Sequence, residues 1–176
     1  AAGKYISTAC AAGDINIAGN DVACTACAAG EYTDDADQTS CKDCSAGTSY
    51  SAAGATECTS CSDPADGQYV SSTCTVTADT ATSSCSEAGS GQYQATACSQ
   101  GTPSQLGSAG TVESCSGNCA AGKKQTNCVQ GDWETQGSDR ECDDCDANTY
   151  SASGATSCTN CDANTESSAG SASCSN

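Results

Sequence analysis

Large apolar side chains are scattered along this chain and follow no helical period. The chain has six Tyr and one Trp but neither Phe nor Met, so it lacks the usual material of a hydrophobic core. Tyr, Thr and Ser gather instead in short segments between turn-forming Gly and Asn residues. This pattern predicts small irregular β-hairpins with strands of only a few residues, little helix, and no central hydrophobic core.

A regular series of C-x-x-C pairs divides the chain into similar units. The pairs are Cys24 and Cys27, Cys41 and Cys44, Cys58 and Cys61, then Cys142 and Cys145, Cys158 and Cys161. A fixed step of 17 residues in the first group and 16 in the second indicates repeated supersecondary units. The expected fold is a small disulfide-rich repeat protein, an elongated string of cystine-closed β-hairpin-like loops whose contacts are confined to adjacent units.

Each unit carries turn-forming residues at two fixed places. Gly30 and Asn148 occupy the third position after the opening Cys, where both residue types tolerate a positive φ. A Tyr or Trp usually follows, and we expect it to lie over the neighbouring disulfide. A second turn is expected late in the loop, at Gly54, Gly154 and Gly170.

The repeats divide the chain into three segments. Residues 1–98 and 142–176 carry cysteine-rich repeats, and residues 99–141 form an atypical cysteine-rich segment because Cys115, Cys119 and Cys128 interrupt the regular step. The element that begins at Gly67 returns at Gly91 after 24 residues. A related element opens the chain without its preceding Cys, so we expect the first unit to be truncated.

The even number of 18 cysteines predicts nine disulfides and no free thiol. The simplest pairs join each opening Cys to the next closing one: Cys10–Cys24, Cys27–Cys41, Cys44–Cys58, Cys61–Cys74, Cys85–Cys98, Cys145–Cys158 and Cys161–Cys174. Two alternatives remain for the other four: Cys128–Cys142 with Cys115–Cys119, or the crossing pairs Cys115–Cys128 and Cys119–Cys142. Closing a loop of about 15 residues contributes roughly 3 kcal/mol, so stability should be local to each loop.

Charge and composition exclude several classes of function. A net charge of −17 argues against a nucleic-acid partner, which requires clustered Lys and Arg. The absence of His removes the commonest general base and zinc nitrogen ligand, so we expect neither enzymatic activity nor a cofactor. Dense disulfides indicate an extracellular or cell-surface location.

The cysteine pairs and the acidic clusters invite metal and redox hypotheses as well as structural ones. Paired C-x-x-C motifs suit a four-thiolate zinc site, but the pairs do not fall into groups of four. The residues that flank them are mostly neutral or acidic, which disfavours a reactive thiol. Two acidic clusters suggest calcium, although a solvated acidic surface explains them as well. Their members are Asp34, Asp35 and Asp37 in the first and Asp143, Asp144 and Asp146 in the second.

The repeats resemble the cysteine-rich repeats of ciliate surface antigens, the immobilisation antigens. The closest stretches run from Cys41 to Cys58 and from Cys142 to Cys158, where Gly or Asn, Tyr and a late Gly-Ala-Thr recur in register with the Cys. More distantly they are similar to growth-factor-receptor and tumour-necrosis-factor-receptor cysteine-rich modules. The first resemblance implies a non-catalytic, lipid-anchored coat protein.

We therefore expect a non-enzymatic structural protein of a cell-surface coat or filament. It would assemble into a homo-oligomer or homopolymeric fibre, with O-glycans on its many Ser and Thr residues and a lipid anchor at its C-terminus. The alternative is a ligand-binding cysteine-rich receptor-type ectodomain. Trp133 with Arg140 is the candidate hot spot for such a ligand.

Overall fold

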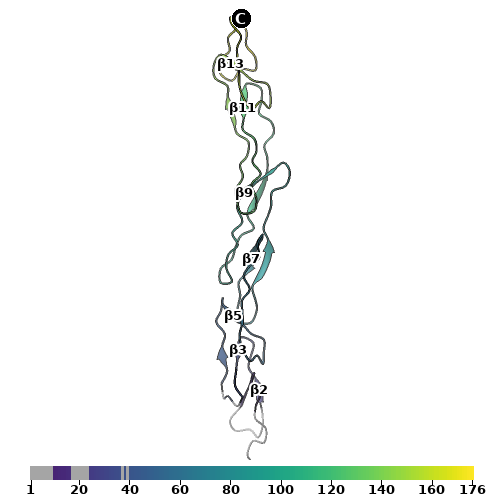
Figure 1. Ribbon diagram of the computed structural model, residues 1–176, viewed down its shortest axis with the longest axis vertical. Helices are drawn as coiled ribbons and strands as arrows, with labels where there is room; N and C mark the ends of the chain where they lie inside the picture. Colours follow the sequence, from purple (N-terminus) through teal and green to yellow (C-terminus); the bar gives the residue numbers. More distant parts are fainter. Residues whose placement is uncertain (1–9, 17–23, 37, 39) are drawn as a thin grey trace, which may run out of the picture. The chain divides into compact units, whose positions relative to one another are not determined.

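The computed structural model describes residues 10–16, 24–36, 38 and 40–176. These residues form short antiparallel strands and no helix, so nothing in the described part of the chain is long and apolar enough to cross a membrane as a helix. Short strands joined by irregular segments are visible in Figure 1. The strands are β1 (Asp14–Asn16), β2 (Cys24–Ala26), β3 (Glu31–Tyr32), β4 (Lys42–Asp43), β5 (Ser49–Tyr50), β6 (Thr59–Ser60), β7 (Gln68–Ser72), β8 (Ala81–Ser84), β9 (Gln92–Thr96), β10 (Thr111–Ser114), β11 (Lys123–Gln125), β12 (Cys142–Asp144), β13 (Thr149–Tyr150) and β14 (Thr159–Asn160).

Every sheet among the described residues contains two strands. The strands pair in chain order, β1 with β2 through β13 with β14. The chain folds into two units, unit 1 (Ala1–Cys85 and Ser99–Ala109) and unit 2 (Ser86–Cys98 and Gly110–Asn176). The expected small disulfide-rich hairpin fold is confirmed.

All 18 cysteines are oxidised, as the even count predicts. The bonds are Cys10–Cys24, Cys27–Cys41, Cys44–Cys58, Cys61–Cys74, Cys115–Cys128, Cys119–Cys142, Cys145–Cys158 and Cys161–Cys174, and Cys85 and Cys98 are disulfide-bonded as well. Of the two alternatives left open by the sequence, the structure contains the crossing pairs.

Cysteines replace the hydrophobic core. The buried apolar residues of the described chain are mostly half-cystines, joined only by Val70 and Ala88. Four polar residues are buried with them: Thr33, Ser51, Gln94 and Ser151. The Tyr residues in the described part of the chain are only half-buried, and Lys42 lies over the ring of Tyr32 with its Nζ 5.7 Å from the ring centre.

The predicted turns have the expected backbone conformation. Gly30 has a φ of 90° and Asn148 a φ of 66°, in the left-handed region that Gly and Asn tolerate. The late turns agree, since Gly54, Gly154 and Gly170 also have positive φ values. The Gly and Asn residues of the sequence therefore predicted the positions of both turns in the repeat correctly.

The early turn of several loops bonds to the next loop through its backbone. The N–H of Gly30 donates to the carbonyl of Ser51 at 3.0 Å, and the N–H of Cys44 donates to the carbonyl of Gly30 at 2.8 Å. The same two bonds recur at Gly122 with Ser151 and Cys145, and at Asn148 with Ser167 and Cys161. Because the turn exposes its own peptide groups, this link between loops needs no large side chain.

The late turn bonds in the opposite direction, to the preceding loop. The N–H of Gly54 donates to the carbonyl of Cys27 at 2.9 Å, and the N–H of Gly170 to that of Cys145 at 2.8 Å. A buried serine adds a side-chain bond at the same junction, as Ser151 Oγ donates to the carbonyl of Lys123 at 2.8 Å. Ser51 and Ser167 make the equivalent bonds to Glu31 and Thr149.

Contacts also reach past the adjacent loop, so the expectation of purely nearest-neighbour contacts was wrong. A Cβ added at Gly13 would overlap the carbonyl oxygen of Gly54, two loops further on. A Cβ at Gly122 would likewise overlap the carbonyl oxygen of Gly170. The early turn of one loop comes this close to the late turn of the second next loop because neither carries a side chain there.

Two hairpin fingers, finger 1 (residues 99–108) and finger 2 (residues 129–138), pack on the longest strands. Finger 1 is closed by the bridge Ser99↔Ser108 and finger 2 by Val129↔Ser138. Finger 1 forms backbone hydrogen bonds with both the N–H and the C=O of Val70 in β7. Finger 2 bonds in the same way to the N–H and the C=O of Gln94 in β9. Both of these central strand residues are fully buried, with no measurable exposure.

Replacing Ser151 by Ala should loosen the junction between the Cys119–Cys142 and Cys145–Cys158 loops. Loss of a buried hydrogen bond costs about 1–2 kcal/mol, which is roughly a 5–30-fold change in the opening equilibrium. Native-state hydrogen exchange at the amide of Gly122, which donates to the Ser151 carbonyl, measures this directly. Ser157→Ala, at an exposed site of the same loop, is the control and should leave that exchange unchanged.

Replacing Gly122 by Ala should destabilise unit 2 more than replacing Gly91 by Ala. Both glycines have positive φ, so each substitution incurs the strain of a left-handed Ala, about 1–2 kcal/mol. Only at Gly122 would the new methyl group also overlap a carbonyl, since nothing lies within 4 Å of a Cβ at Gly91. Thermal unfolding with the disulfides intact compares the two variants, and equal losses would contradict the close approach.

Candidate functional site

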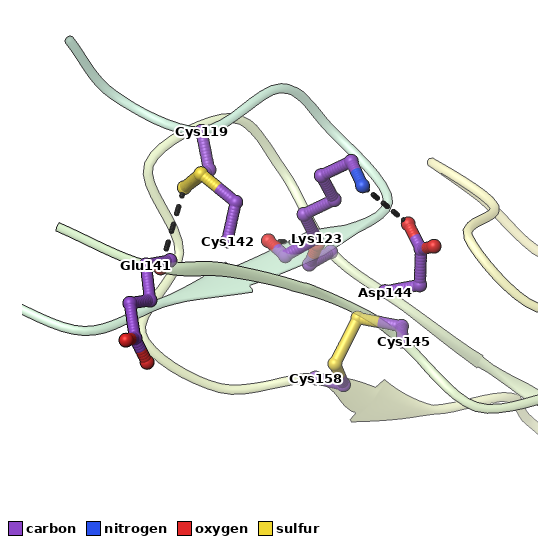
Figure 2. Close-up of polar contacts among 8 residues, drawn as sticks. Cys119, Lys123, Glu141, Cys142, Asp144, Cys145 and Cys158 are labelled. Atoms are coloured by element: carbon purple, nitrogen blue, oxygen red, sulfur yellow. Dashed lines mark hydrogen bonds and ion pairs between the residues drawn. A yellow bond between two sulfur atoms is a disulfide. The ribbon is translucent and has the colours of Figure 1, made fainter. Parts of the chain in front are cut away.

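The crossing disulfides occupy the region where the regular cysteine step fails. Figure 2 shows Cys119–Cys142 beside the hairpin of β11 and β12, near Cys145–Cys158. Cys119 is buried, and its Sγ lies 3.7 Å from the carbonyl oxygen of Glu141. The Cys119–Cys142 bond ties the segment before β11 to β12, and no free thiol remains there.

Acidic residues of the predicted calcium clusters pair with lysines. Asp34 accepts two hydrogen bonds from Lys42 Nζ, at 2.6 and 2.8 Å. In the second cluster Lys123 Nζ lies 2.7 Å from Asp144, as Figure 2 shows, and Lys124 lies 4.0 Å from Asp143. Asp37 lies outside the described residues.

No three of these carboxylates converge in the described part of the chain. The one group there with metal-ligand spacing is Cys61, Cys74 and Asp79. Its two sulfurs are bonded to each other, so they cannot act as thiolate ligands. The same holds for the C-x-x-C pairs considered for zinc, all of which are oxidised.

Two aspartates form equivalent clamps that the sequence did not single out. In unit 1, Asp79 accepts hydrogen bonds from the N–H of Ser62 at 2.8 Å and from its Oγ at 2.7 Å. In unit 2, Asp139 accepts from the N–H of Ser116 at 2.7 Å and from its Oγ at 2.5 Å. In each clamp the Ser directly follows a Cys. The number of residues between that Ser and the Asp differs between the two clamps, so the sequence shows no shared motif.

Hydrogen bonding lowers the pKa of both clamp aspartates. The amide and hydroxyl of Ser62 hold the pKa of Asp79 below its ordinary value. The hydroxyl and amide of Ser116, with the amide of Arg140, do the same to the pKa of Asp139. In each case the donors favour the charged carboxylate.

Trp133 and Arg140, the candidate hot spot, lie in different segments of unit 2. Trp133 is half-buried within finger 2, and its carbonyl accepts the N–H of Cys98 at 2.7 Å. Arg140 follows finger 2, and its Nη1 donates to the carbonyl of Ser116 at 2.7 Å. The described residues show no cation–π contact between the two side chains.

Comparison with known families identifies one matching segment. Residues 16–61 match a family described as tyrosine-protein kinase ephrin type A/B receptor-like, over about a quarter of the chain. No curated protein matches the chain. Together with the dense disulfides, the match indicates a cysteine-rich receptor-like module of the extracellular type.

Lowering the pH should open the Asp139 clamp, because protonation of the carboxylate weakens its hydrogen bonds to Ser116. Because the pKa of Asp139 is lowered by folding, its stabilisation is present above the unfolded value of about 3.9 and is lost as pH falls through the lower folded value. Exchange of the Ser116 amide, corrected for its intrinsic pH dependence, should therefore accelerate below about pH 4.

Asp139→Asn should abolish this pH dependence at Ser116, while the amide of Ser62 at the intact Asp79 clamp retains its own. If the Ser116 amide responds to acid equally in the Asn variant, another group controls the clamp.

Proposed function

We propose that this chain is a non-enzymatic structural element of an extracellular coat or filament. The observation that supports it best is the backbone bonding between successive loops, repeated at Gly30, Gly122 and Asn148. Such bonding depends on turn geometry and tolerates change in the exposed side chains. It suits a molecule whose role is to span distance and resist unfolding in an oxidising environment.

The surface of the chain supports a coat role in a second way. Its resemblance to ciliate surface antigens extends over the loops with the most regular cysteine spacing. Exposed hydroxyl groups, such as that of Ser72 in β7, are available for O-glycosylation. We propose a glycosylated surface antigen held by a C-terminal lipid anchor, and the high negative charge would keep its exposed surface hydrated.

A receptor-type ectodomain is the second candidate. The ephrin receptor-like match over residues 16–61 supports it as much as it supports a coat protein. The two differ in their partners, since a coat protein binds copies of itself and a receptor binds a separate ligand. The state of association in solution therefore separates them.

If copies of the chain assemble, added salt should favour the assembly. At −17 per copy, like charges repel at low ionic strength, and salt screens that repulsion. We expect electron microscopy and analytical ultracentrifugation to show assemblies that persist in high salt and loosen in very low salt. Asp146→Asn, which removes an exposed charge, should shift the loosening to lower salt.

Disassembly by high salt would contradict this account, because it would indicate a lattice held by ion pairs. A particle that stays monomeric at every salt concentration would favour the receptor.

A further inference from the structure

A polar hollow of about 450 Å³ opens in unit 2, and none of the ion-paired residues of β11 and β12 lines it. The disulfide Cys115–Cys128 forms part of its wall. The other walls come from the start of β9, from finger 2 and from the segments after β11 and after finger 2. They contribute three amide side chains and one guanidinium: Gln92, Asn127, Gln130 and Arg140.

The three amides retain both donors and acceptors for a ligand. Gln92 Oε1 accepts the N–H of Gly89 at 3.1 Å, which leaves its NH₂ group unused. Gln130 Nε2 donates to the carbonyl of Ala88, which leaves its Oε1 unused. Asn127 is exposed and makes no side-chain bond within unit 2. Paired donors and acceptors of this kind match the vicinal hydroxyl groups of a sugar.

Arg140 gives the hollow a cation that forms no ion pair, although the neighbouring Asp139 carboxylate interacts with it electrostatically. The other cationic side chains of the described residues, Lys42, Lys123 and Lys124, are in ion pairs, whereas Arg140 is in none. Its Nη1 is bonded to the Ser116 carbonyl, but its Nε is buried without a hydrogen-bond partner. Because Nε has almost no accessible surface, a ligand would meet the Nη groups of the guanidinium, where a carboxylate would form a charge-assisted hydrogen bond.

We propose that this hollow binds a carboxylate-bearing saccharide unit of the uronic acid type. The carboxylate would pair with Arg140, and the sugar hydroxyls would bond to the amides of Gln92, Asn127 and Gln130. A bare anion is a poor ligand because the chain carries a net charge of −17 and repels it at long range. A neutral sugar would not use the positive charge of Arg140. The site therefore requires both parts of the ligand.

Titration of ¹⁵N-labelled protein with glucuronate tests the proposal. Millimolar glucuronate should shift the amide resonances of residues around the hollow, and glucose and acetate should bind about tenfold more weakly or less. Arg140→Gln should weaken glucuronate binding about tenfold or more. Lys124→Gln, which removes an exposed cation elsewhere in unit 2, should not change it.

Asn127→Ala covers the case in which Arg140→Gln disturbs the fold, since this exposed amide has no structural bond to lose. It should weaken glucuronate binding several-fold. Three results would overturn the proposal: no shifts around the hollow, acetate binding as well as glucuronate, or unchanged affinity in the Asn127 variant. None of these results depends on whether copies of the chain assemble.

Discussion

The hydrogen bonds between the early turn of one loop and the backbone of the next are the interaction on which the rest of this structure depends. Without a core, a disulfide-closed loop has no apolar face with which to hold its neighbour. The peptide groups of Gly30 and Asn148 supply that attachment because a positive φ directs both their N–H and their C=O toward the following loop. Disulfides close each loop, and the turns join the loops.

This division of roles explains which features could be predicted from sequence. The turns and most disulfides follow from local chemistry, namely which residues tolerate a positive φ and how far apart the cysteines lie. The crossing of Cys115–Cys128 with Cys119–Cys142 could not be decided, because either pairing closes loops of acceptable length. The approach of Gly122 to Gly170 was missed because it joins loops that are not consecutive, and no local pattern encodes it.

The fingers were missed for a different reason. Gln100-Gly101 and Gly107-Ser108 in finger 1 recur as Gln130-Gly131 and Gly137-Ser138 in finger 2, a repeat of 30 residues. Neither finger contains a Cys, so a search guided by cysteines passed over this repeat. The strand residues that the fingers cover, Val70 and Gln94, differ in polarity although both are fully buried, which also conceals the equivalence. Arg140 was singled out from the sequence, but the amides around it were not, because they come from separate segments.

The hollow lies where the regular stack of loops is broken, and the break accounts for its chemistry. Along the regular repeats, the two turns and the buried serine use the peptide groups between neighbouring loops, so little polar capacity remains for a ligand. Around Cys115–Cys128, finger 2 and the crossing disulfides interrupt that arrangement. There the amide side chains of Gln92 and Gln130 bond to the backbone groups of Gly89 and Ala88. Each amide uses one end in this way and keeps the other end free. A ligand in the proposed hollow would therefore leave the bonds that hold the loops together unchanged.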